Sequence, residues 1–338
     1  MDVFYYKDPA GNFGDDLNEL IWPQLLDDVW QTKTNITLVG IGSILWEKPL
    51  SDLVDRGRHP VVLGSGISYR NPPRDLSELS VLAVRGPLTA DLLGQPDKSL
   101  TDGAILISEI DGPHQTRRSR ENVLFMPHHR TLRRTPWAEI AQEAGFQYVS
   151  PQQSFEETLR AFATARLIVT EALHGAIVAD ALRIPWLPVR ISPRFEEFKW
   201  HDWCLSMHVQ FEPFDILPGD ASDARNFKAI ARLLEKSGVL GLKINADKEL
   251  SKQISHYVSR RFDPNLQQAM LEPVPMHAVS RAYNLARRLL DSRFRRQSIH
   301  SLMALKEHPG FLSSDLVHEQ RLRQMGTAVE ALKDMVRA

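Results

Sequence analysis

Short apolar runs bounded by turn residues alternate with amphipathic stretches along the first part of the chain. Helical spacing of apolar residues predicts helices over residues 17–29 and 87–93, and Pro87 suits the first turn of the second helix. The apolar runs predict buried strands over residues 3–6, 36–39, 60–63, 81–84 and 104–107. Because strands and helices alternate, we expect a parallel sheet.

A polar stretch over residues 108–122, with Gly112 and Pro113, interrupts this alternation and predicts a linker between two lobes. The alternation then resumes. The second set of predicted strands is 123–126, 147–149, 167–170 and 186–189, and the predicted helices are 136–144, 155–164 and 175–182. The predicted fold class is therefore α/β, with two Rossmann-like lobes.

After about residue 245 the strand signals end, and amphipathic patterns predict a helical C-terminal extension with helices over residues 248–262, 276–295 and 317–336. We predict three parts: an N-terminal lobe over residues 1–112, a C-terminal lobe over 118–245 and the extension over 246–338. Six arginines gather in one segment of the extension: Arg281, Arg287, Arg288, Arg293, Arg295 and Arg296. They would suit a membrane surface or an anionic partner, and a solvated helix face is the simpler alternative.

Composition narrows the classes of function. The formal net charge is -1, so no overall field favours nucleic acid, and none is expected as a partner. Cys204 is the single cysteine, which excludes an internal disulfide and a multi-cysteine metal site and fits a reducing compartment. The first residues lack the basic and apolar regions of a signal peptide, and no apolar run approaches the ~20 residues of a membrane span. We expect a cytoplasmic location, with any membrane contact peripheral.

Candidate chemistry begins at the turn between the first strand and the first helix, which holds Asn12, Gly14, Asp15 and Asp16. Free backbone N–H groups and the helix dipole favour an anion or a polar ligand there. One of the two aspartates is expected to cap the helix. The other carboxylate then remains to bind a ligand or to accept a proton.

Two glycine turns, one with Gly42 and Ser43 and one with Gly66, follow predicted strands and fall at the carboxyl edge of the sheet. Ligands of open α/β sheets bind outside that edge, and glycine lets the backbone approach them closely. The sequence Gly40, Gly42, Leu45 lacks the third glycine of a dinucleotide fingerprint, so an NAD site is not predicted.

Basic residues follow two further strands. Arg85 could hold a phosphate or a carboxylate, with a surface salt bridge as the alternative. His128, His129 and Arg130 suit proton transfer or anion binding. No acidic or cysteine residue is spaced to complete a metal site with them, so no metal is predicted.

The turn from Thr170 to Gly175 holds Glu171 and His174 between a strand and an apolar helix. A carboxylate three residues from a histidine can orient the imidazole and adjust its pKa for acid or base chemistry. A charged, aromatic run follows, with Arg194, Lys199, Trp200 and Trp203. Its tryptophans suit a sugar face beside an anion, and packing between helices explains them equally well.

In their order and spacing, five motifs resemble the polysaccharide pyruvyl transferase family, most closely its exopolysaccharide-biosynthesis members. The likeness covers roughly residues 1–240. The motifs are Asn12 to Asp15, Val84 to Gly86, Thr101 to Ala104, Leu173 to Gly175 and Phe198 to Cys204.

The resemblance implies a two-lobed fold of the GT-B type. It also implies transfer of a pyruvyl group from phosphoenolpyruvate to two hydroxyls of one sugar as a cyclic ketal, in exopolysaccharide or cell-surface glycan biosynthesis. No cofactor is implied beyond the donor substrate, and the saccharide acceptor is either free or lipid-linked. His174 oriented by Glu171 would be the acid or base, and Asp15 or Asp16 would position the acceptor or take its proton. The expected contacts to phosphate and carboxylate are Arg85, His128, His129, Arg130, Arg194 and Lys199.

The sequence departs from the family pattern at Ala172, where many relatives have arginine, and at Glu171, where serine is frequent. Arg194 or Lys199 could replace the missing cationic contact. The alternative enzyme is a GT-B glycosyltransferase that uses a nucleotide sugar, in which Glu171 would hold the ribose. A third alternative is a scaffold that binds polysaccharide or an assembly partner through its helical extension.

Overall fold

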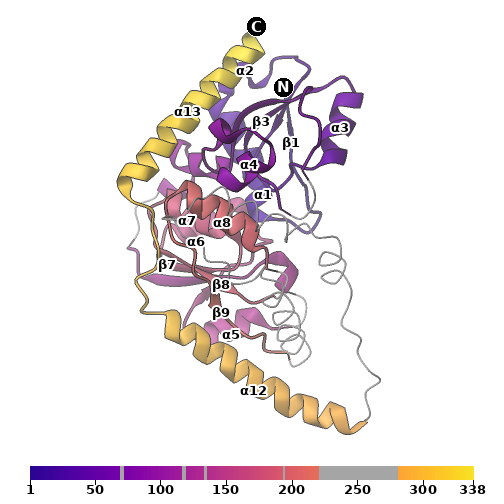
Figure 1. Ribbon diagram of the computed structural model, residues 1–338. Coiled ribbons are helices and arrows are strands. Elements are labelled where there is room, and N and C mark those ends of the chain that lie inside the picture. The colour runs from indigo at the N-terminus through magenta and orange to yellow at the C-terminus, as the bar shows by residue number, and fades with distance from the viewer. Residues whose placement is uncertain (69–71, 116–118, 133–134, 193–194, 221–280) are drawn as a thin grey trace.

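The computed structural model describes residues 1–68, 72–115, 119–132, 135–192, 195–220 and 281–338 (Figure 1). Within these residues, two sheets of parallel strands form two lobes, the first above the second in Figure 1. The α/β class and the two parallel sheets predicted from the sequence are therefore confirmed.

The first sheet has the order β1-β2-β3-β4, and all of its pairs are parallel. Successive strand residues point to opposite faces, so Leu38 packs with the core on one face and Val39 with the core on the other. Burial on both faces explains why these strands have nearly continuous apolar sequences. The strands are β1 (Asp2–Phe4), β2 (Ile36–Val39), β3 (His59–Ser65) and β4 (Ser80–Val84).

Helices cover both faces of this sheet. The α1 residue Leu17 belongs to the core cluster of one face, and Leu50 of α3 and Leu88 of α4 belong to the cluster of the other. The sequence did not predict α3, whose only buried residue is Leu50. The helices are α1 (Phe13–Leu25), α2 (Asp27–Trp30), α3 (Glu47–Asp55) and α4 (Pro87–Leu92).

The strand predicted over residues 104–107 is wrong, because this segment is the 3₁₀ helix η2 (Gly103–Glu109). The Asp102 side chain starts the helix by accepting a hydrogen bond from the backbone N–H of Ala104 at 3.0 Å. Residues 103–107 are all buried. A short, wholly buried apolar run has no periodicity that separates a strand from a helix, which is why the sequence misled.

The second sheet has the order β6-β5-β7-β8-β9, again with parallel pairs. The chain adds β6 on one side of β5 and then β7 on the other side, so the winding reverses between β5 and β7. Ligands of doubly wound sheets bind outside the carboxyl ends of the strands at such a switch point. The strands are β5 (Asn122–Met126), β6 (Gln147–Tyr148), β7 (Ala165–Thr170), β8 (Trp186–Arg190) and β9 (Phe214–Asp215).

The two lobes share a hydrophobic core. Leu124 of β5 and Ile168 of β7 belong to the same buried cluster as Leu17 of the first lobe. This continuity arises because α7 packs against both η2 and α1. On the opposite face of the second sheet, α5 covers Phe125. The helices of this lobe are α5 (Trp137–Glu143), α6 (Phe155–Phe162), α7 (Leu173–Ala181) and α8 (Glu197–Ser206).

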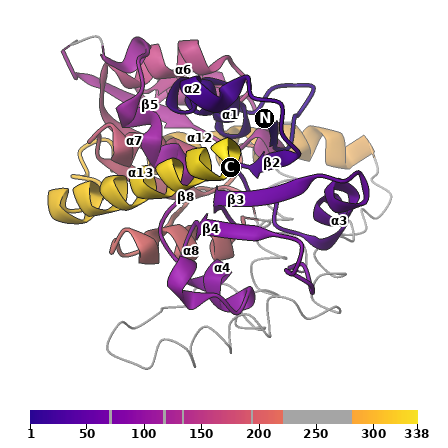
Figure 2. The same cartoon turned by 90° about the horizontal axis from the view of Figure 1, so that it is seen from above.

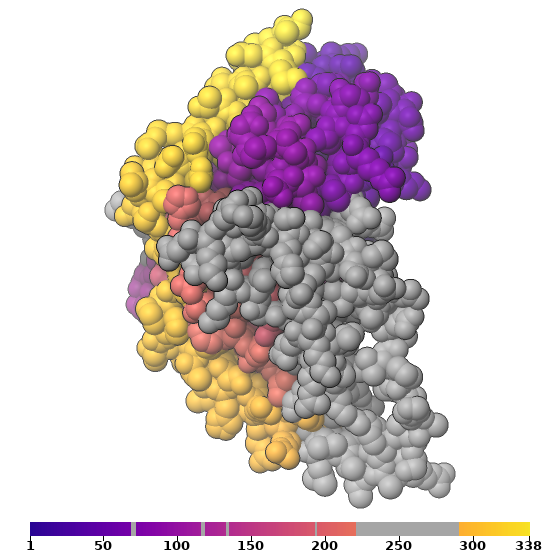
Figure 3. Space-filling view, viewed as in Figure 1, coloured from indigo at the N-terminus to yellow at the C-terminus, as the bar shows by residue number. Residues whose placement is uncertain are grey.

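Two long helices follow in the described part of the extension, α12 (Arg281–Leu305) and α13 (Asp315–Arg337). The former packs against α5 of the second lobe (Figure 1), and the latter against η2, β3 and β4 of the first lobe. Figure 2 shows α13 lying along β3 and β4. In the space-filling view they run down one flank of the molecule (Figure 3). The helix predicted over residues 248–262 lies outside the described residues, and the three domain boundaries stay a prediction.

Polar contacts fix both ends of α13. Just before its start, the Ser313 backbone N–H donates to Asp180 Oδ2 at 2.9 Å in the second lobe. Near its end, Lys333 and Arg337 pair with Asp28 of α2 in the first lobe. The helix therefore spans the two lobes. None of the helices in the described part of the chain has the length and apolar character needed to cross a membrane.

Candidate active site

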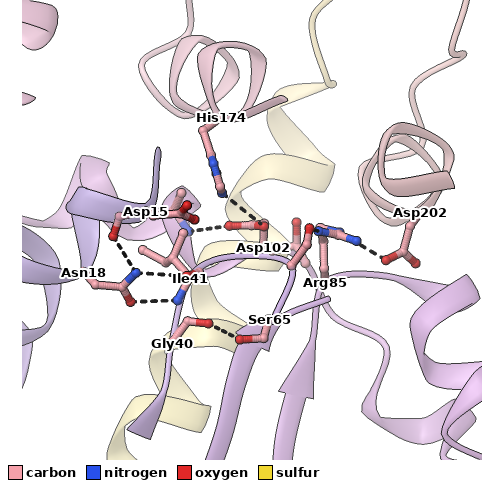
Figure 4. Close-up of polar contacts among 12 residues, drawn as sticks. Asp15, Asn18, Gly40, Ile41, Ser65, Arg85, Asp102, His174 and Asp202 are labelled. Carbon is pink, nitrogen blue, oxygen red and sulfur yellow. Dashed lines mark hydrogen bonds and ion pairs between the residues drawn. The ribbon is translucent and has the colours of Figure 1, made fainter. Parts of the chain in front are cut away.

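Residues that follow the strands of both sheets meet where the two lobes join (Figure 4). The first lobe contributes Asp15 at the start of α1 and Asp102 at the start of η2. The second lobe contributes His174 in the first turn of α7, which follows β7. The carboxyl ends of the strands, and with them the switch point of the second sheet, therefore face this junction.

The His174 ring lies against α1 and faces Asp102. A Cβ atom at Gly14 would be 1.9 Å from His174 Nδ1, so only glycine leaves room for the ring. The other ring nitrogen, Nε2, is 3.9 Å from Asp102 Oδ2, and the two side chains are 16% and 0% exposed. Both atoms are buried, and neither has a hydrogen-bond partner among the described residues. The pair crosses the boundary between the lobes.

Burial, together with nearby charges, shifts the pKa values of this pair. Burial, with Lys199 and Arg85 nearby, lowers the pKa of His174 to about 3. Burial raises the pKa of Asp102 to about 6, although Arg85 opposes the rise. At neutral pH a neutral imidazole therefore faces a mostly ionised carboxylate. Such an imidazole can accept a proton.

The two aspartates of the first turn of α1 have different surroundings. Asp16 Oδ2 accepts a hydrogen bond from the Asn12 backbone N–H at 3.0 Å, which closes the turn. Asp15 is buried, accepts a hydrogen bond from Asn12 Nδ2 and lies beside Gly42, whose φ of +136° favours glycine. Burial raises the pKa of Asp15 to about 7. Asp16 therefore bonds to the backbone of the N-cap residue Asn12, and Asp15 is the group that can exchange a proton near neutral pH.

Asn18, one helical turn later, fixes Asp15 in place. Its amide nitrogen donates to the carbonyls of Asp15 and Ile41 at 2.8 and 2.9 Å. Its oxygen accepts from the Ile41 N–H and from Trp22 Nε1, both at 2.8 Å. The buried amide is thus fully bonded and joins α1 to the turn that follows β2.

Arg85, predicted to hold a phosphate or a carboxylate with a surface salt bridge as the alternative, is only 1% exposed. Its Nε donates to Asp202 Oδ2 at 3.2 Å, and its Nη1 donates to Ser43 Oγ at 2.8 Å. The guanidinium lies on Gly66, where a Cβ would be 2.2 Å from Cζ. Gly66 and Ser43 therefore hold the Arg85 side chain in place. Arg85 affects the site mainly through its positive charge, which acts to lower the pKa values of His174 and Asp102.

Asp202 of α8 makes the other half of this contact and was not predicted as a site residue. Its Oδ1 accepts from the backbone N–H groups of Leu88 and Thr89 at 2.9 and 3.0 Å. A side chain of α8 thus caps α4 in the other lobe, since no side chain at the α4 N-cap does so. The run that suggested a sugar face is largely packed, with Trp200 and Trp203 fully buried.

Cationic and titratable groups gather at the switch point. The rings of His128 and His129, which follow β5, have centroids 4.2 Å apart. Burial and the charges of Arg130 and Lys199 lower the pKa of His129 to about 4, and burial and Lys199 lower the pKa of His128 strongly. The positive charge of Lys199 also acts to lower the pKa values of Asp15, Asp102 and His174. Arg194 lies outside the described residues.

Glu171 does not meet His174, contrary to the sequence prediction. Its Oε1 accepts from the N–H groups of Ile191 and Ser192 at 3.1 and 2.7 Å, and its Oε2 accepts from the His128 N–H at 3.0 Å. Glu171 directly follows β7 and bonds to segments of its own lobe, whereas His174 lies in the first turn of α7 and faces Asp102 of the first lobe. The buried carboxylate therefore holds together the chain segments that follow β5 and β8.

The model of the family described as polysaccharide pyruvyl transferase matches residues 40–193. Succinoglycan biosynthesis protein ExoV of Rhizobium meliloti (strain 1021) is 34% identical over 216 residues, which cover 63% of this chain and 67% of that protein. The chain belongs to the polysaccharide pyruvyl transferase family. No solved structure matches it.

In this pyruvyl transferase, the matched residues 40–193 include Arg85, His128 and His174. Asp15 and Lys199 lie outside that range and reach the junction from either side of it in sequence. Among the described residues, no group of three or more histidine, cysteine, aspartate or glutamate side chains is placed to hold a metal ion.

Proposed function

We propose that this pyruvyl transferase takes its pyruvyl group from phosphoenolpyruvate and moves it onto two hydroxyls of a saccharide as a cyclic ketal. We further propose a role in the synthesis of an exopolysaccharide or another cell-surface glycan, because the relative ExoV is named for succinoglycan biosynthesis. The observation that carries the proposal is the junction itself. There, His174, Asp15 and Asp102, which can exchange protons, lie beside a cluster of cationic groups.

The chemistry needs groups that both give and take protons. The C3 carbon of the donor gains a proton, and C2 becomes electrophilic. One hydroxyl oxygen bonds to C2 and loses its proton, and the C2–O bond to phosphate then breaks. The second hydroxyl bonds to C2 and loses its proton, which closes the ketal and leaves inorganic phosphate. The departing phosphate also takes up a proton, so the protons gained by C3 and by phosphate balance the two that the hydroxyls lose. Asp15, with a pKa of about 7, and the neutral His174 suit these transfers.

The donor carries a phosphate and a carboxylate, and we place both groups at the switch point of the second sheet. His128, His129, Arg130 and Lys199 supply positive or hydrogen-bonding groups there. Arg194 stays a predicted contact. A bound anion would favour the imidazolium forms and would raise the pKa values of His129 and His174.

We place the acceptor against the first lobe, where Asn12, Asp15 and Asp16 line the start of α1. Carboxylate and amide groups bind sugar hydroxyls well. Two α/β lobes with a site between them also support a GT-B-like arrangement.

The decisive experiment is an assay of the purified chain with phosphoenolpyruvate and a panel of hexose oligosaccharides, free and attached to a lipid carrier. We expect phosphate release that needs both substrates, together with the methyl signal of a pyruvyl ketal in the proton NMR spectrum. Replacing His174 by Gln should slow transfer by about 10²-fold or more. His300→Asn, at an exposed histidine of α12, is the matched control. A failure to form ketal with every acceptor would overturn the proposal.

The glycosyltransferase alternative is tested in the same preparation. A ligand that binds only the folded state raises the thermal midpoint, so phosphoenolpyruvate should raise it, and UDP-glucose and GDP-mannose should not. Sugar transfer from a nucleotide sugar would favour the glycosyltransferase alternative. The match to the pyruvyl transferase family does not favour it.

We also propose peripheral contact with the cytoplasmic membrane surface through the arginine-rich segment of the extension. Arg295 in this segment already pairs with Glu139 and Glu143, whereas Arg293 and Arg296 are exposed. Flotation with anionic vesicles should carry the protein upward, and an Arg293→Glu, Arg296→Glu variant should float less. Protein that stays in the dense fraction would contradict this contact. Deletion of the extension is no substitute, because it removes the buried Leu302 and Leu332.

A further inference from the structure

We propose that Asp102 is the positioning residue of His174 and holds the ring through Nε2, so that Nδ1 meets the substrate. This inference rests on the proposed function. It replaces the Glu171–His174 pair expected from the sequence, since Glu171 is bonded to three backbone N–H groups elsewhere. A base oriented by a second group through its far nitrogen is a recurrent arrangement in enzymes.

The carboxylate of Asp102 is aimed at the ring. Its Oδ1 accepts from the Ala104 N–H at 3.0 Å, which fixes the orientation of the carboxyl group. Its Oδ2 is buried, has no other partner in the described structure and lies 3.9 Å from His174 Nε2. A shift of about 1 Å would make a hydrogen bond. Catalytic hydrogen bonds are often long in the free enzyme and tighten when substrate binds.

The opposite edge of the ring packs on Gly14 of α1. A Cβ at this position would be 1.9 Å from Nδ1, so any larger residue would displace the ring from its place beside Asp102. Nε2 is buried against Asp102, whereas 16% of the His174 side chain is exposed. Because Nε2 faces Asp102, we place the acceptor hydroxyl at Nδ1.

The proton transfer then follows a defined route. The O–H bond of the acceptor hydroxyl breaks, its proton moves to Nδ1, and its electron pair forms the new bond to C2 of the donor. The ring becomes an imidazolium, and its Nε2–H donates to Asp102 Oδ2. Without this carboxylate, the groups that face the ring disfavour its positive charge, because Lys199 of α8, Arg85 after β4 and His128 after β5 all carry or can carry the same sign.

Replacing Asp102 by Asn separates this role from that of a helix cap. The amide oxygen can still accept from the Ala104 N–H, but an NH₂ group replaces Oδ2 and cannot accept from Nε2. We expect kcat to fall by about 10²-fold or more, with little change in the KM for phosphoenolpyruvate and in the thermal midpoint. Asp111→Asn, at an exposed carboxylate in the same part of the chain, should leave kcat unchanged.

The pH profile gives a readout that a cap alone would not move. In the wild type, kcat/KM should fall as the pH drops below about 6, because Asp102 becomes protonated. The Asp102→Asn variant should lack this fall. If the wild type transfers pyruvate and the variant keeps its rate within about 3-fold and its pH profile, the inference is wrong. A uniform loss at every pH with a lower thermal midpoint would also contradict it.

If the Asp102→Asn variant does not fold, an NMR measurement on the wild type alone still tests the inference. The ¹⁵N chemical shifts of the His174 ring should show the proton on Nε2 at neutral pH, and the opposite tautomer would overturn the inference. This result does not depend on turnover. An absence of ketal formation in the wild type would count against the proposed function, while the tautomer still decides whether Asp102 holds the ring.

Discussion

Arg85 Nε lies 3.2 Å from Asp202 Oδ2, both side chains are buried, and the pair joins β4 of the first lobe to α8. Removing one partner of a buried ion pair leaves an uncompensated charge, which typically costs 3–5 kcal/mol. Asp202→Ala also removes the cap of α4. We therefore expect the free energy of unfolding, measured with urea, to fall by about 3–5 kcal/mol.

The matched control for this prediction is Asp97→Ala, which breaks the exposed pair Lys98–Asp97 and should cost less than about 0.5 kcal/mol. The double variant Arg85→Ala, Asp202→Ala should lose less than the sum of the single losses, because the charges compensate each other. Strict additivity would mean that the two residues do not act together.

Gly14→Ala tests the packing of His174 on α1. The added methyl group would lie 1.9 Å from Nδ1, so the ring must move, and such displacements can cost about 10²-fold in rate. Gly326→Ala in α13 is the control, since a Cβ there meets no atom within 4 Å. It should raise stability by roughly 0.5–1 kcal/mol and leave the rate unchanged. Wild-type activity in Gly14→Ala would show that His174 does not need its observed position.

Asp15→Asn should change how stability depends on pH. The pKa of Asp15 is about 7 in the folded protein, well above its ordinary value of 3.8. Its contribution to stability is therefore full below about pH 4 and is lost as the pH rises through about 7. Asparagine has no such loss, so the variant should gain on the wild type by roughly 2 kcal/mol between pH 5 and pH 8. Parallel unfolding curves at the two pH values would contradict the raised pKa.

Glu171→Gln tests whether this residue is structural. Glutamine can still accept one set of N–H bonds, but its NH₂ group would face a backbone N–H donor, which costs about 1–3 kcal/mol. We expect lower stability by urea unfolding and an unchanged pH profile of kcat/KM for the folded fraction. A pH profile altered as in Asp102→Asn would instead restore Glu171 as the partner of His174.

Much of the fold follows from patterns within single segments. The apolar runs located all four strands of the first sheet and four of the five strands of the second sheet, because strands buried on both faces have continuous apolar sequences. The same reasoning failed at η2, where a buried helical turn has an equally apolar run. The order β6-β5-β7-β8-β9 and the return of α13 to the first lobe depend on docking between distant segments.

In the candidate site too, the sequence revealed what depends on a single segment and missed what depends on contacts between distant segments. Arg85, His128 and His174 were found because polar residues directly after parallel strands fall at one edge of a sheet. The residues that contact them were not found from the sequence. Arg85 and Asp202, for example, are 117 positions apart and meet only when α8 docks on the first lobe. Asp102 belongs to one of the motifs shared with the family, but nothing in the sequence indicated that it faces His174. Glu171 misled because nearness along the chain does not make two side chains point the same way.

The return of α13 also sets the order in which the protein can complete its fold during synthesis. Met325 and Leu332 of this helix are buried in the same cluster as Leu17 of α1. The ribosome releases the first lobe long before it releases residues 315–337, so apolar surface of the first lobe stays uncovered until α13 has emerged. A nascent chain of this protein should therefore depend on a chaperone for longer than it would if the first lobe could bury its apolar surface without α13.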